Sequence, residues 1–177
     1  MKRWKWWHGA LFLAGIGVVQ GALMSTVRDA QSSDLYKKAR LPKFAPPQAA
    51  FPIAWAANAV SLTAGLIRAL NLPDEREGRH AYIRWQIAGW ALFVLFNPVY
   101  FGLRSPINAA AITLLYSIAT AESAAIAVSD VKDTPLTCSL ATTCAWLCLA
   151  VPLSIAQAAM NRDEFWGVDA LFGPSEP

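Results

Sequence analysis

The sequence predicts an all-α membrane protein, a bundle of five transmembrane helices in which a long first loop acts as a lid. Of its 177 residues, 55% are hydrophobic and only 15% are charged, whereas an average soluble domain has about 25% charged residues. Five apolar runs are each long enough to cross a bilayer, which takes about 20 residues in a helix. The eight tryptophans fit the same class, because indole rings favour membrane interfaces.

The expected helices cover residues 6–27, 49–70, 81–103, 106–128 and 135–160, within a single domain that spans residues 1–166. A segment in lipid must satisfy its own backbone groups, so each run is expected to be helical. Residues 167–177 are acidic and contain proline, and we expect a flexible tail there. The net charge of +3 is modest and its basic residues cluster at segment ends, which favours interfacial anchors over nucleic acid binding. The expected location is a bacterial membrane, crossed several times.

The first run admits two interpretations. Lys2, Arg3 and Lys5 precede it, as in a signal peptide. Its early tryptophans and its length favour a helix that is retained. Gly17 and Gly21 form a small-xxx-small pair, which permits close helix packing in lipid or reflects the tolerance of membrane helices for glycine.

Polar residues within the next two runs are candidates for facing the bundle interior. Asn58 lies within a turn of Trp55, and Asn97 is polar at membrane depth. Pro98 removes a backbone hydrogen bond and is expected to kink the third helix. The short links after the second and third runs predict two antiparallel hairpins.

The last two runs carry residue types that can take part in chemistry, a carboxylate on the fourth and cysteines on the fifth. Glu122 is an intramembrane carboxylate, either functional or close enough to the helix end to reach water. Cys138, Cys144 and Cys148 all lie on the fifth run, where we interpret them as small packing residues. No metal site is expected, because neither histidine lies deep in the membrane.

The loop between the first two runs is basic, rich in proline and bounded by aromatic residues. Pro42, Pro46 and Pro47 hold its backbone extended. Phe51 and Trp55 follow at i, i+4 spacing and so share one face of the second helix. The loop is either a lid over a flat ligand or a connector with interfacial anchors.

This loop resembles the signature of the TspO/MBR family, also called tryptophan-rich sensory protein, translocator protein or peripheral benzodiazepine receptor. The residues that match in register are Tyr36, Pro42, Pro46, Pro47, Phe51 and Trp55, and Phe44 stands where the family has Trp. The segment 96–102 resembles a second family motif. The chain departs from the pattern at Ala59 and Ala156, where the family has Tyr and Trp.

The resemblance implies a homodimer, or a subunit of a membrane complex, whose pocket lies beneath the first loop and binds porphyrin, haem or another flat lipophilic molecule. The function we expect is therefore that of a tetrapyrrole-binding sensor, regulator or carrier with no obligatory cofactor. Some relatives break down porphyrin in light with the help of two tryptophans. This chain has Ala156 in place of one of them, so we expect no enzymatic activity. The alternative is a structural or assembly subunit of a larger, possibly pigment-binding complex. The candidate ligand-binding residues are Tyr36, Phe44, Pro46, Pro47, Phe51, Trp55, Asn58, Asn97 and Trp146.

Overall fold

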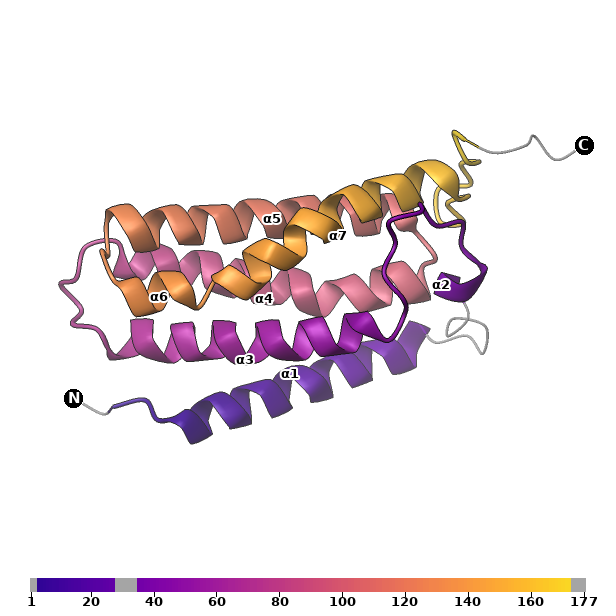
Figure 1. Cartoon of the computed structure of the whole chain (residues 1–177). Helices are drawn as coiled ribbons and strands as arrows, with labels where there is room; N and C mark the ends of the chain where they lie inside the picture. Colours follow the sequence, from indigo (N-terminus) through magenta and orange to yellow (C-terminus); the bar gives the residue numbers. More distant parts are fainter. Residues whose placement is uncertain (1–2, 28–34, 173–177) are drawn as a thin grey trace, which may run out of the picture.

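The computed structural model describes residues 3–27 and 35–172, and the regular elements in these ranges are helices. The long ones run along a common axis and form one elongated bundle (Figure 1). The long helices are α1 (Trp6–Val27), α3 (Ala50–Asn71), α4 (Arg79–Asn97), α5 (Pro106–Ser129) and α7 (Ala141–Met160). The short elements are α2 (Leu35–Lys38), the π-helical turn η2 (Pro98–Gly102) and α6 (Thr134–Cys138). Each of the five predicted runs thus overlaps one long helix, and α4 begins two residues before its run.

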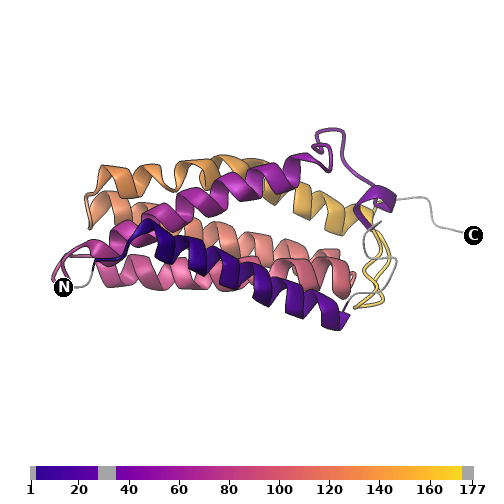
Figure 2. The same ribbon diagram turned by 90° about the horizontal axis from the view of Figure 1, so that it is seen from below.

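Helix α5 is central to the bundle, because it packs against α4 on one side and against α7 on the other. The core includes Tyr82, Leu136 and Leu140, which are almost completely buried. Helix α1 lies along the outside of the bundle, next to α3 and α4 (Figures 1 and 2). It contacts the core through Phe12, Leu13 and Ile16 and is otherwise largely exposed.

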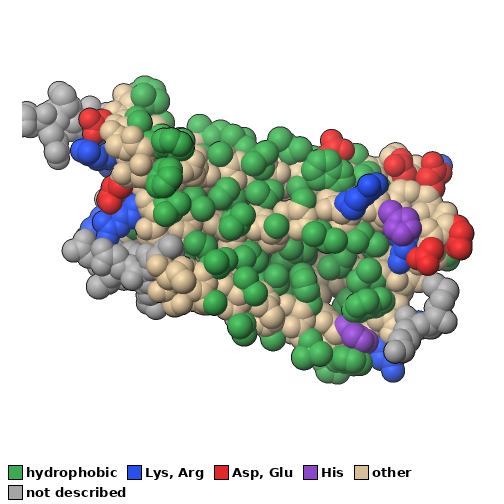
Figure 3. All heavy atoms as spheres, turned by 180° about the vertical axis from the view of Figure 1, so that it is seen from behind, with side chains coloured by type: hydrophobic (Ala, Val, Ile, Leu, Met, Phe, Trp, Pro, Cys, Tyr) green, Lys and Arg blue, Asp and Glu red, His purple; other side chains and the backbone are tan. Residues whose placement is uncertain are grey.

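The surface has the distribution expected of an integral membrane protein. Hydrophobic side chains cover the middle of the face shown in Figure 3, and charged side chains gather at its two ends. In the described part of the chain, four segments are long and apolar enough to cross a membrane: Trp6–Thr26, Ala50–Asn71, Pro106–Ser129 and Thr134–Met160. Helix α4 is outside this set, because Arg79, His80 and Arg84 lie in its first turns.

Two of the predicted helices are interrupted. The predicted helix 135–160 is divided into α6 and α7 at Ser139 and Leu140. There the Ser139 hydroxyl donates to the carbonyl of Leu136 (2.6 Å), and the Ser139 carbonyl accepts from the hydroxyl of Ser61 (2.8 Å). Side-chain hydroxyls therefore supply hydrogen bonds to backbone carbonyls where the helix is interrupted. The third predicted helix leaves the α conformation at Pro98 and continues as η2, as the missing N–H of proline favours.

The folded chain extends beyond the predicted domain end at residue 166. Asp163 and Val168 form an isolated antiparallel bridge, and the amides of Leu171 and Phe172 donate to the carbonyl of Ala159. These hydrogen bonds connect the segment that follows residue 166 to the end of α7, and the flexibility expected of residues 167–177 stays a prediction. Of these, residues 173–177 lie outside the described residues.

The first loop crosses the end of the bundle where α3 begins and α7 ends (Figure 1). The buried Tyr36 of α2 donates its hydroxyl proton to the carbonyl of Pro46 (2.9 Å). Asn161, just after α7, accepts from the amide of Arg40 (2.7 Å) and donates to its carbonyl (2.9 Å). One side chain therefore holds the loop to the end of α7.

Candidate functional site

A cavity of about 340 Å³ opens between the long helices, toward the end that carries the loop. All five long helices contribute to its wall. The lining residues are Gln20, Phe51, Pro52, Trp55, Leu92, Phe93, Phe96, Asn97, Ile112, Thr113, Tyr116, Trp146, Leu147, Ala150, Leu153, Ser154 and Gln157. No charged side chain of the described residues lines it, so the cavity is suited to an apolar ligand.

Aromatic rings dominate one wall of this cavity. Trp55 lies against Phe93, Tyr116 and Trp146, with ring centroids 5.1, 5.9 and 6.2 Å apart. Phe51 continues the cluster, since its ring centroid is 5.4 Å from that of Trp146 in an edge-to-face arrangement. Such pairs contribute about 0.5–1.5 kcal/mol each beyond the area they bury, so the wall is pre-organised before any ligand enters.

The loop supports this aromatic wall from behind. Tyr36 packs edge-to-face on Phe51, with centroids 5.0 Å apart. Burial raises the pKa of the Tyr36 hydroxyl, which therefore remains a neutral donor to Pro46. The series Tyr36, Phe51 and Trp146 thus connects the loop to the cavity wall by direct ring contacts.

Most polar groups of the cavity already have partners within the protein. Gln20 donates from Nε2 to the carbonyl of Phe93 (3.1 Å), and the hydroxyls of Thr113 and Ser154 donate to carbonyls of their own helices. Two buried donors have no hydrogen-bond partner in the described structure: Nε1 of Trp146 and Nε2 of Gln157. The cavity therefore offers aromatic surface together with a small number of unpaired N–H groups.

The structure brings four of the predicted site residues together. Phe51, Trp55, Asn97 and Trp146 all line the cavity. Ring contacts join three of them, Phe51, Trp55 and Trp146. The face that the i, i+4 spacing of Phe51 and Trp55 predicted is therefore the face turned toward the cavity.

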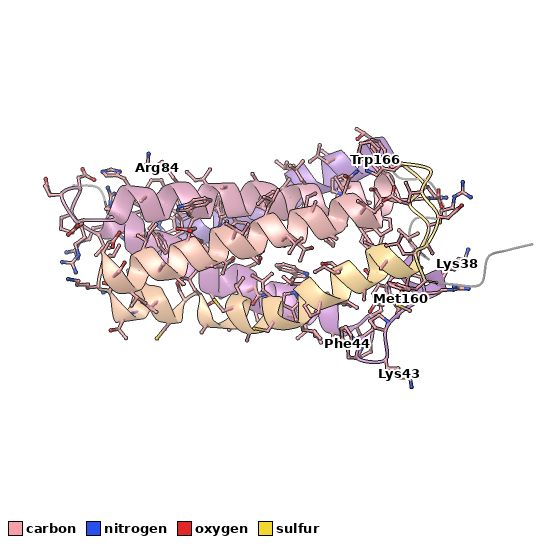
Figure 4. The ribbon with its side chains drawn as sticks, turned by 90° about the horizontal axis from the view of Figure 1, so that it is seen from above. Lys38, Lys43, Phe44, Arg84, Met160 and Trp166 are labelled. Atoms are coloured by element: carbon pink, nitrogen blue, oxygen red, sulfur yellow. The ribbon has the colours of Figure 1, made fainter. Side chains whose placement is uncertain are left out.

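Five predicted site residues lie outside the cavity wall. Tyr36 and Pro46 form the hydrogen bond of the loop, and the carbonyl of Pro47 accepts from the amide of Ala50. Asn58 is buried with its Nδ2 unpaired, but it does not line the cavity. Phe44 is half exposed and points away from the bundle (Figure 4). A contact between ligand and any of these side chains remains a prediction.

Sequence reasoning missed Phe93, Tyr116 and Gln157 in the cavity wall. A helical-wheel comparison would have found Gln157, because it lies 11 residues after Trp146 and so returns to the same face of α7 after about three turns. Glu122, the candidate carboxylate, is exposed on the outer face of α5. The cysteines Cys138 and Cys148 are likewise exposed. Among the described residues, no group of three His, Cys, Asp or Glu side chains is placed to hold a metal ion.

A comparison with protein-family models identifies the family. The model described as the TspO/MBR family matches residues 10–159, which include all five long helices except the ends of α1 and α7. A search of curated proteins finds no match.

Proposed function

The chain belongs to the TspO/MBR family, and we propose that it binds a tetrapyrrole such as porphyrin or haem, or a similar flat lipophilic molecule, in the cavity between its helices. In this proposal it acts in the membrane as a sensor, regulator or carrier, with α4 as the fifth spanning helix. The observation that carries the proposal is the cavity itself, whose wall is aromatic and uncharged.

The size and chemistry of the cavity support a flat apolar ligand. Pockets for drug-sized molecules measure about 300–1,000 Å³, and this one measures about 340 Å³. Stacking of a conjugated ring system on Trp55 and Trp146 adds to the favourable burial of its apolar surface. Only part of a tetrapyrrole fits into such a space, so we propose that one edge of the macrocycle extends toward the loop.

A porphyrin titration of the purified protein in neutral detergent tests the proposal. Protoporphyrin should quench tryptophan fluorescence saturably, and Trp55→Ala should weaken binding by about tenfold, since it removes a stacking partner at the cavity wall. The matched control is Trp6→Ala, because Trp6 is 79% exposed and far from the cavity wall. If Trp55→Ala and Trp6→Ala have equal affinities, the ligand does not occupy this cavity.

The same sample distinguishes binding from chemistry. We propose binding without turnover, because Ala156 stands where the family has a tryptophan. The absorbance of bound protoporphyrin should therefore be no less stable in light than that of protoporphyrin in empty detergent micelles. A protein-dependent loss of absorbance, abolished by Trp55→Phe, would assign an enzymatic reaction to the chain instead.

A further inference from the structure

A second, smaller cavity of about 140 Å³ lies beneath the loop, at the end of the larger one. It is formed by α2, η2, the start of α5 and the end of α7. Its lining residues are Leu35, Lys38, Ala39, Tyr100, Pro106, Gln157, Asn161 and Arg162. Of the residues that the structure describes, Gln157 alone lines both cavities, so it lies where they adjoin.

The smaller cavity differs from the larger one in charge. Lys38 and Arg162 contribute two cationic groups, and no acidic side chain of the described residues lines it. Figure 4 shows Lys38 close to the end of α7, near Met160. Arg162 is paired with Asp169 at 3.3 Å, but both side chains are largely exposed, so this pair is weak and its partner is readily exchanged. The cavity is therefore suited to an anion.

Gln157 places an unsatisfied donor at the boundary of the two cavities. The residue is only 7% exposed, and its Nε2 makes no hydrogen bond of normal geometry in the described structure, although the side chain interacts with the hydroxyl of Tyr100. The neighbouring amide of Asn161 is already used, because it donates to the carbonyls of Arg40 and Gln157. A buried donor without a partner is costly, so an acceptor atom of a ligand at this point is strongly favoured.

We propose that the ligand is a lipophilic acid, whose apolar body occupies the larger cavity and whose carboxylate accepts from Gln157 and is neutralised by Lys38 and Arg162. This inference rests on the proposed function and adds to it the chemical class of the ligand. Gln157 is then a specificity-determining residue, which separates acids from neutral molecules of the same shape. The carboxylate can belong to a propionate of a tetrapyrrole or to a fatty acid, since both present the same group.

The test compares acids with their neutral esters in neutral detergent at pH 7.5. The first pair is protoporphyrin IX and its dimethyl ester, and the second is palmitic acid and its methyl ester, measured by displacement of 1-pyrenebutyric acid. We expect the acid to bind at least about tenfold more tightly than the ester in one of the pairs, because a hydrogen bond to a charged group is stronger than one to a neutral group. The pair that shows the preference identifies the source of the carboxylate.

Variants assign the preference to this site. Lys38→Met should weaken binding of the acid by about tenfold and leave the affinity for the ester unchanged, so the ester reports that this variant is folded. Gln157→Leu should weaken binding of the acid by about tenfold and weaken the ester less, because the ester carbonyl accepts only a neutral hydrogen bond. The matched control is Lys43→Met, because Lys43 is on the same loop, lines neither cavity and points away from the bundle (Figure 4). It should retain the full preference for the acid.

The outcomes separate this inference from the proposed function. If acid and ester bind equally and Trp55→Ala weakens both, the ligand occupies the larger cavity and the assignment of a carboxylate is overturned. If the preference for the acid survives in Gln157→Leu and Lys38→Met, it arises elsewhere and the inference is likewise overturned. If none of the four compounds binds, the proposed function fails as well.

Discussion

Asn161 closes the loop over the bundle, and its substitution should open the loop without unfolding the helices. The side chain makes two hydrogen bonds to the backbone of Arg40, at 2.7 and 2.9 Å. A typical intramolecular hydrogen bond contributes about 1 kcal/mol net, so Asn161→Ala should destabilise the closed loop by about 2 kcal/mol. This free energy corresponds to an increase of about 30-fold in the open population.

Limited proteolysis in detergent measures that population. Trypsin can cleave after Lys38, Arg40 and Lys43, and the rate follows the open fraction when the loop opens and closes faster than it is cut. Cleavage at these sites should therefore be about 30-fold faster in Asn161→Ala than in the wild-type chain, while the midpoint of thermal unfolding changes little.

A second asparagine provides the matched control. At the opposite end of the bundle, Asn71 accepts from the amide of Trp4 (2.7 Å) and donates to its carbonyl (2.8 Å). Asn71→Ala should accelerate cleavage after Lys5 and leave the loop sites unchanged. The reasoning is refuted if Asn161→Ala leaves the loop as resistant as before, or if both variants accelerate cleavage at both ends.

Two further predictions concern the stability of the bundle. Asp133 caps α6 through the amide of Leu136 (2.9 Å) and pairs with Arg68 (2.6 Å), and these contacts, the second above all, hold its pKa below the usual range. A carboxyl with a lowered pKa stabilises the fold above its unfolded pKa of about 3.9 and loses that contribution as the pH falls through the folded value. The thermal midpoint of wild type should therefore exceed that of Asp133→Asn at pH 6, and the difference should shrink progressively as the pH falls below about 3.9; a constant difference would contradict the pairing. Gly65→Ala places a Cβ 2.9 Å from Cβ of Ser139 and against its hydroxyl, which should destabilise the fold by about 1–3 kcal/mol in detergent unfolding. Gly17→Ala is its control, since nothing lies within 4 Å of the added Cβ, and equal effects of the two substitutions would show that packing is not the cause.

The sequence predicts the helices of this protein better than it predicts their contacts. The backbone groups of an apolar run in lipid must hydrogen-bond within the run, which requires a helix. Each predicted run accordingly overlaps a long helix. The break at Ser139 was missed because no glycine or proline marks it. It depends on the hydroxyl of Ser61, a residue 78 positions earlier in the chain.

The cavity wall was only partly predictable, for a physical reason. A membrane helix is apolar on its lipid face and on its inner face, so its sequence does not show which way it turns. Phe51 and Trp55 were found because the loop motif marks the start of their helix. Phe93 and Tyr116 have no such mark, and only the packing of α4 against α5 places them beside Trp55. The loop hydrogen bond from Tyr36 to Pro46 likewise depends on a fold of the chain that spacing does not show.

The segment after α7 also has a consequence for the order of biosynthesis. The carboxylate of Asp163 accepts from the hydroxyl of Ser105 (2.7 Å) and from the amide of Ile107 (3.0 Å), at the first turn of α5. The start of α5 therefore lacks this cap until a residue more than fifty positions later has been synthesised. During translation the hairpin of α4 and α5 can enter the membrane early, but its turn gains these hydrogen bonds only after Asp163 has left the ribosome.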